Sequence, residues 1–136
     1  MRVLIDTNII ISAALFPNGR AAKAFRKALT APYQPVVSDY IVDELRRVFS
    51  QKWPDKVDAL EVFLRDALSV IELIATPQSA LSTEGALRDA NDRPILRAAL
   101  HAKVDVIITG DRDFLESSIQ NPRIVSVPQF LDGYGG

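Results

Sequence analysis

Apolar residues occur along this chain in two patterns, short continuous runs and longer stretches with helical spacing. The continuous runs are rich in valine and isoleucine, which is typical of strands that helices cover on both faces of a parallel sheet. They predict strands at Val3–Ile5, Val36–Val37, Val70–Ile74, Val104–Ile108 and Ile124–Val127.

The segments between these runs carry apolar residues at three- and four-residue spacing or helix-capping residues, and they predict helices. The helices span Ile9–Phe16, Arg20–Leu29, about Asp39–Val48, about Asp55–Leu68 and about Arg93–Ala102. Ala75–Leu87 has no decisive pattern, and Pro128–Leu131 predicts a short terminal turn. Strands that alternate with helices predict an α/β fold, a single three-layer α/β/α domain over residues 1–136 with a mainly parallel sheet of four to five strands.

Acidic side chains stand where two of the predicted strands end. Asp6 follows the first strand, and Gly110, Asp111 and Asp113 follow the fourth. Open α/β sheets bind ligands outside the carboxyl ends of their strands, and glycine allows the sharp turn that we expect at residue 110. We therefore expect the functional site at this edge of the sheet.

Two further carboxylates can reach the same edge. Glu44 lies in the second turn of the helix after the second strand, and Asp92 opens the helix before the fourth strand. Carboxylates a few ångströms apart raise one another's pKa or require a cation. Mg²⁺ or Mn²⁺ suits such a cluster because both ions prefer oxygen ligands.

The amino-acid composition limits the kinds of metal site and catalytic site that the chain can form. The 136 residues include no cysteine and one histidine, which excludes disulfides and cysteine-bound zinc and argues against a histidine-based site. The formal net charge of −1 does not indicate a nucleic-acid-binding protein, although a local basic rim is compatible with it. No apolar run approaches the roughly 20 residues of a membrane span, and the start Met1–Asp6 lacks a signal-peptide pattern, so we expect a cytoplasmic protein with no membrane partner.

Four short segments stand in order along the chain: Leu4–Asn8, Val37–Ser38 with Asp43–Leu45, Arg88–Asp92 before a helix, and Ile108–Phe114. Together they resemble the PIN-domain family, specifically bacterial PIN proteins similar to the toxin components of toxin–antitoxin pairs. The likeness extends from Val3 to about Leu131. The order and spacing of the segments make it more specific than any segment alone.

The resemblance implies a metal-dependent ribonuclease in which a metal-bound water attacks the phosphorus. Its catalytic metal ligands correspond to Asp6, Glu44, Asp92 and Asp111, with Asp113 as a fifth metal ligand. Asn8 corresponds to the polar residue that supports the first aspartate, and Thr109 is a second supporting residue. The resemblance further implies an RNA substrate, products with 5′-phosphate and 3′-hydroxyl ends, a cognate antitoxin and a homodimer.

Basic side chains near the acidic residues are candidates to hold RNA phosphates. Three lie on the polar face of the helix Arg20–Leu29, and two come directly after Glu44. The candidates are Arg20, Lys23, Lys27, Arg46, Arg47, Arg112 and, further along the chain, Arg88 and Arg93.

Other interpretations of these residues stay open at this point. Asp6 and Asp92 can simply cap helices, and Asp111 with Asp113 can form a turn. The same Asp111–Asp113 pair fits a Toprim-type Mg²⁺-dependent nuclease, although that class places a glutamate where Asp6 stands. A response-regulator receiver needs a lysine near the last strand, which Val125–Val127 lacks. A catalytically silent PIN-like RNA-binding or assembly module would be expected to lack part of the acidic set.

Overall fold

The computed structural model describes residues 1–133, in which short strands alternate with helices. The strands are β1 (Arg2–Ile5), β2 (Gln34–Ser38), β3 (Glu72–Ile74), β4 (Val106–Ile108) and β5 (Arg123–Val125). The α-helices are α1 (Thr7–Leu15), α2 (Arg20–Ala28), α3 (Asp39–Lys52), α4 (Val57–Ala67), α5 (Arg93–His101), α6 (Arg112–Leu115) and α7 (Val127–Gly133). Short 3₁₀ helices are η1 (Pro54–Lys56), η2 (Ser82–Ala86) and η3 (Ala90–Asp92).

The five strands form one parallel sheet in the order β3-β2-β1-β4-β5. β1 is central, and its Leu4 is in register with Val36 of β2 and Ile107 of β4. The chain proceeds from β1 outward to β2 and β3, and it then returns to β4 on the other side of β1. This reversal makes a topological switch point between β1 and β4, the place where open α/β sheets bind ligands at their carboxyl end.

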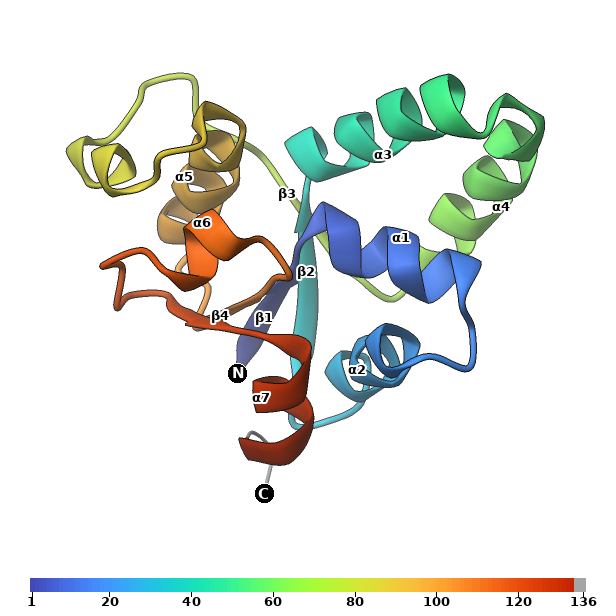
Figure 1. Ribbon diagram of the computed structural model, residues 1–136, viewed down its shortest axis with the longest axis horizontal. Helices are drawn as coiled ribbons and strands as arrows, with labels where there is room; N and C mark the ends of the chain where they lie inside the picture. The colour runs from blue at the N-terminus through green and yellow to red at the C-terminus, as the bar shows by residue number, and fades with distance from the viewer. Residues whose placement is uncertain (134–136) are drawn as a thin grey trace.

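Helices cover both faces of the sheet (Figure 1). α1, α2 and α4 lie on one side of the strands, and α5 and α6 lie on the other. α3 starts directly after β2 and packs against α1, α4 and α5, so its first turns lie at the carboxyl-end edge of the sheet. The predicted three-layer α/β/α fold with a parallel sheet is confirmed.

The two central strands are buried because helices cover them on both sides. Val3, Leu4 and Ile5 of β1 and Ile107 and Ile108 of β4 have no exposed surface. Burial on both faces explains why these strands are continuous apolar runs in the sequence. Each such side chain contributes about 1.5–3 kcal/mol on burial, and together they fix the strand ends that carry the acidic residues.

The carboxyl-terminal segment differs from the sequence prediction. β5 ends at Val125, and Val127 begins α7 instead of continuing the strand. The reason is a capping box: the Ser126 backbone N donates to Gln129 Oε1 at 2.9 Å, and the Gln129 backbone N donates to Ser126 Oγ at 3.2 Å. The helix therefore starts where the apolar pattern alone predicts strand and turn.

The segment Ala75–Leu87, for which the sequence has no decisive pattern, is held to α5 by an ion pair between the buried Glu84 and the half-buried Arg97. Arg97 donates two hydrogen bonds of 2.9 Å to the Glu84 carboxylate and a third, also 2.9 Å, to the Pro77 carbonyl. Polar contacts between distant residues leave no periodic signal, which explains the missing prediction. Among residues 1–133, no helix has the length and apolar character needed to cross a membrane.

Candidate functional site

Asp6 is held by hydrogen bonds at the carboxyl end of β1. It is 3% exposed, and its Oδ1 caps α1 by accepting a 2.7 Å hydrogen bond from the Thr7 backbone N. Its Oδ2 accepts a 2.7 Å hydrogen bond from the Thr109 hydroxyl. Helix capping and a place in a carboxylate cluster are therefore compatible roles for the same residue.

Thr109 joins the end of β4 to the end of β1. Besides donating to Asp6, its buried hydroxyl oxygen accepts a hydrogen bond from the Asp111 backbone N at 3.0 Å. Asp111 Oδ1 in turn accepts from the Asp113 backbone N at 2.8 Å and caps α6. One threonine thus orients Asp6 and positions the loop that carries Asp111.

Asn8 and Gly110 differ from their sequence interpretation. Asn8 Oδ1 accepts a 3.3 Å hydrogen bond from the Gly110 backbone N, so Asn8 ties α1 to the loop after β4 instead of supporting Asp6 directly. The backbone of Gly110 is not in the left-handed region, and an added Cβ would meet only Asn8 atoms at 3.7 Å or more. A sharp turn that requires glycine is therefore wrong for this position.

Glu44 reaches the same place from the second turn of α3. Its Oε1 accepts a short hydrogen bond from the Thr7 hydroxyl, and its Oε2 lies 3.5 Å from the Arg47 guanidinium. The Glu44 side chain is 18% exposed. The two contacts hold its carboxylate at the edge of the cleft described below.

The loop before α5 supplies two more aspartates. Asp89 Oδ1 accepts a 2.9 Å hydrogen bond from the Asn91 backbone N, which starts the η3 turn that ends at Asp92. Carboxylate oxygens of Asp89, Asp92 and Asp111 lie within 4.8 Å of one another. Asp92 is 5% exposed, and within residues 1–133 its Oδ2 has no hydrogen-bond partner. A buried carboxylate oxygen without a donor is costly unless a bound cation compensates it.

Burial and mutual repulsion raise the pKa of two aspartates in this cluster. Desolvation raises the pKa of Asp92 to about 8, and hydrogen bonding to Asp111 and repulsion from it act in the same direction. Desolvation also raises the pKa of Asp6 to about 6, although the hydrogen bonds from Thr109 and Thr7 oppose the increase. At neutral pH the metal-free cluster therefore retains a proton that a divalent cation would displace.

These side chains line one cleft of about 230 Å³. Its lining residues are Asp6, Thr7, Asn8, Ile11, Glu44, Val48, Lys52, Asp89, Asn91, Asp92 and Asp111. Hard divalent cations prefer carboxylate oxygens and water. The carboxylates of the cleft, with the unpartnered Asp92 oxygen among them, fit such an ion.

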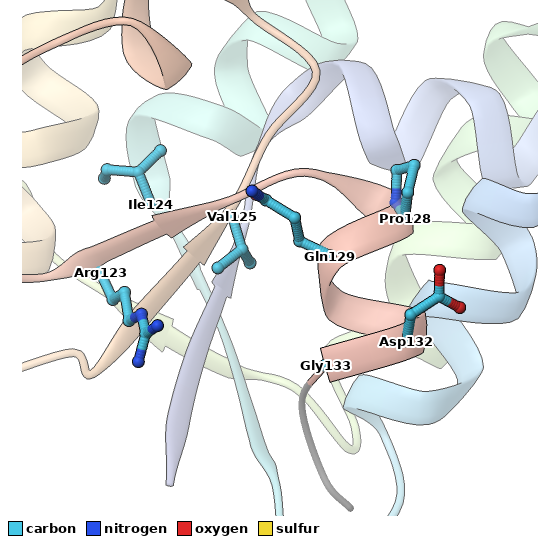
Figure 2. A pocket seen from close by; sticks show the side chains of 7 residues that line it. All are labelled: Arg123, Ile124, Val125, Pro128, Gln129, Asp132 and Gly133. Atoms are coloured by element: carbon cyan, nitrogen blue, oxygen red, sulfur yellow. The ribbon is translucent and has the colours of Figure 1, made fainter.

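A larger hollow of about 610 Å³ lies between β5 and α7 (Figure 2). It is lined by Arg123, Ile124, Val125, Pro128, Gln129, Asp132 and Gly133. Asp132 is the one acidic residue among these described lining residues, so the hollow offers no carboxylate cluster. The smaller cleft is the better candidate for the functional site because it is lined by clustered carboxylates.

The structure brings four of the predicted acidic residues to the cleft and leaves one outside its lining. Asp6, Glu44, Asp92 and Asp111 line the cleft. The carboxylate of Asp113, predicted as a fifth metal ligand, instead accepts a 2.9 Å hydrogen bond from Arg88. Asp111 is the N-cap of α6, whereas Asp113 lies in its first turn.

The predicted RNA-binding cations lie outside the described cleft lining, and most contact other groups of the protein. Lys27 donates to the Phe130 carbonyl at 2.6 Å and lies 4.8 Å from the centroid of its ring. The ion pairs of the others are Arg20–Asp132 at 4.0 Å, Arg46–Glu61 at 3.0 Å, Arg47–Glu44 at 3.5 Å and Arg112–Glu116 at 3.2 Å. Lys23 is exposed on α2. Sequence distance from Asp6 is a poor guide because α2, which packs against α1 and α7 (Figure 1), contributes no residue to the described cleft lining.

Two charged residues of the cleft lining, Asp89 and Lys52, were not singled out by the sequence analysis as site residues. Asp89 lies three positions before Asp92, and this spacing within a polar turn is a signal that could have identified it. Lys52 lies eight positions after Glu44 on the same helix, which places both on one face after about two turns. The sequence shows that Lys52 and Glu44 share one helix face. It does not show that this face lines the cleft.

The fold and the cleft together define a class of molecule: a parallel α/β/α domain with a carboxylate cluster at its switch point. The PIN domain family matches residues 2–113, and the chain belongs to this family. The family resemblance found in the sequence is thereby confirmed. Among curated proteins, none matches the chain.

Solved structures with a similar fold include chains of three complexes. A chain of VapBC2 from Rickettsia felis bound to a DNA fragment from its promoter is 19% identical, with a TM-score of 0.71, and the match covers 93% of this chain and 98% of that one. A chain of DNA-bound VapBC from Salmonella typhimurium is 17% identical, with a TM-score of 0.68 and the same coverage. A chain of FitAcB from Neisseria gonorrhoeae is 20% identical, with a TM-score of 0.62 and coverage of 91% and 95%. At these identities the likeness establishes the fold.

Proposed function

We propose that this protein is a divalent-metal-dependent ribonuclease and the toxin of a toxin–antitoxin pair. The observation that carries the proposal is the cluster at the switch point, where oxygens of Asp89, Asp92 and Asp111 lie within 4.8 Å of one another. Membership of the PIN domain family supports nuclease chemistry for such a cluster. Mg²⁺ or Mn²⁺ is the proposed cofactor because the ligand set consists of oxygens.

The metal would be held by Asp92 and Asp111, with Asp6, Glu44 and Asp89 as the neighbouring carboxylates. When bound, it supplies a water of lowered pKa and a positive charge that offsets the leaving oxygen. Thr109 orients Asp6 through its hydroxyl, and the Thr7 hydroxyl holds the Glu44 carboxylate. The protein thus keeps the carboxylates in place before substrate arrives, which avoids the cost of ordering them during the reaction.

The proposed reaction is hydrolysis of an RNA phosphodiester bond, with 5′-phosphate and 3′-hydroxyl products. Water is the nucleophile, so the reaction does not need the 2′-hydroxyl of the substrate.

We also propose that the protein acts in the cytoplasm and that it assembles as a homodimer.

The toxin assignment rests on the sequence resemblance and on the likeness in fold to chains of VapBC complexes. A cognate antitoxin protein is the partner that this role requires. A small DNA-binding protein encoded next to this chain would support the assignment.

The alternative functions are less well supported by the same residues. A silent PIN-like module would not need a complete acidic cluster or the hydrogen bonds that position it. A Toprim-like site would use Asp111 and Asp113 together, but Asp113 binds Arg88. The nuclease remains the function that uses the observed cluster.

The test is a metal-dependence assay on a panel of RNAs with the Asp111→Asn and Asp43→Asn variants. Asp43 is an exposed neighbour of Glu44 outside the described cleft lining. We expect cleavage with Mg²⁺ or Mn²⁺, none with chelator, and a loss of about a thousandfold or more in Asp111→Asn only. Equal cleavage by Asp111→Asn and wild type would contradict the proposal.

A further inference from the structure

The cleft is lined by one basic side chain, that of Lys52, which has no role in the proposed metal site. Lys52, the last residue of α3, lines the cleft, and it is the only lysine or arginine among the described lining residues. Within residues 1–133, the Lys52 side chain has no hydrogen-bond or ion-pair partner. The other cations considered for RNA binding, apart from the exposed Lys23, are engaged with carboxylates or carbonyls of the protein.

The position of Lys52 relative to the carboxylates follows from helix geometry. Glu44, Val48 and Lys52 are spaced by four residues, so they form one stripe along α3 that faces the cleft. Eight residues span about 12 Å along a helix axis. Glu44 therefore lies at one end of this stripe and Lys52 at the other.

The stretch between the two charged ends is apolar. Val48 of α3 and Ile11 of α1 line the cleft from facing helices. The cleft thus presents, in order, a carboxylate cluster, a short apolar section and a single positive charge. This order suits a polyanion whose charged groups are separated by less polar parts, as phosphates are by sugars and bases.

We propose that Lys52 binds a phosphate of the RNA other than the one being cleaved, with the intervening nucleotide lying over Ile11 and Val48. The inference rests on the proposed function and deepens it, because it assigns a direction along α3 to the bound strand. A second phosphate contact also answers how an acidic cleft holds RNA. The metal site alone only offsets the carboxylates, whereas Lys52 adds attraction.

The test compares Lys52→Gln with Lys103→Gln. Lys103 is an exposed lysine in the turn between α5 and β4, at the opposite edge of the sheet from the cleft. Both variants lose one charge, so they differ only in where it is lost. Binding of a short mixed-sequence single-stranded RNA, whose phosphorothioate linkages resist cleavage, is measured with Mg²⁺ between about 50 and 200 mM salt.

We expect Lys52→Gln to weaken binding several-fold at the lowest salt and to reduce the slope of log K against log salt by about one. Lys103→Gln should retain the wild-type slope, and both variants should bind Mn²⁺ as wild type does. With cleavable substrates, Lys52→Gln should lower kcat/KM for a longer RNA and leave that for a dinucleoside monophosphate unchanged.

An unchanged salt slope in Lys52→Gln, or the same loss in Lys103→Gln, would overturn the role of Lys52. A wild-type protein that binds the RNA but cleaves none of the substrates would contradict the ribonuclease proposal while leaving the binding test of Lys52 decisive. A wild-type protein that binds no RNA in Mg²⁺ would overturn both.

Discussion

Two buried carboxylates in this small domain, those of Glu84 and Asp92, have opposite electrostatic surroundings. Glu84, 3% exposed, receives two hydrogen bonds from Arg97 and one from the Leu81 backbone N, and these partners lower its pKa. Asp92, 5% exposed, has other carboxylates as its neighbours, and its pKa is raised to about 8. Among residues 1–133, the Glu84 carboxylate is paired with an arginine, whereas Asp92 Oδ2 has no hydrogen-bond partner.

The difference separates a structural site from a candidate functional one. A buried carboxylate that serves the fold is paired with a cation of the same chain, because an unpaired charge there costs several kcal/mol. A carboxylate cluster without such a cation is unfavourable for the fold alone. Its retention at the switch point of the sheet is explained if a divalent ion supplies the missing charge.

Removing the cation of the structural site should have the largest effect on stability. Arg97→Met leaves Glu84 buried and unpaired and also frees the Pro77 carbonyl. We expect a clear loss in the free energy of unfolding, measured by urea titration, because the Glu84 carboxylate loses its cationic partner. Arg65→Met, at an exposed position on α4, is the control and should change stability by less than about 1 kcal/mol. An equally small change in Arg97→Met would contradict the structural role assigned to the Glu84–Arg97 ion pair.

The pH dependence of the free energy of unfolding should also distinguish Asp92 from Glu84, with a smaller effect than the Arg97 substitution. Asp92 has an ordinary pKa of 3.8 when unfolded and about 8 when folded, so the folded state holds its proton over that range. The stability that it contributes is complete below about pH 4 and is lost as the pH rises toward 8. Glu84, with its lowered pKa, contributes in the opposite direction and loses its contribution in acid.

In chelator, urea titrations of wild type and Asp92→Asn from about pH 5 to pH 8 should therefore diverge. Wild type should lose stability relative to the variant as the pH rises. Parallel curves would indicate that Asp92 ionises normally in the folded state.

The sequence predicted the position of the site better than its detailed contacts. Asp6 and Asp111 were found because they follow buried strands, and the ends of such strands meet at one edge in a parallel sheet. Asp89 and Lys52 were missed because their contribution depends on which face of a loop or helix forms the wall. The contact between Glu84 and Arg97, and that of Asn8 with Gly110, depend on tertiary neighbours that no local pattern specifies.

Calorimetric titration with Mn²⁺ near neutral pH, repeated in buffers of different ionisation enthalpy, tests the central claim most directly. The cluster should bind Mn²⁺ and release protons, because Asp92 retains a proton in the metal-free protein at this pH. Asp111→Asn should weaken binding by at least about tenfold, whereas Glu84→Gln, if folded, should bind as wild type does. Saturable binding with proton release is the predicted result. No binding up to millimolar Mn²⁺, or equal binding by wild type and Asp111→Asn, would contradict the account.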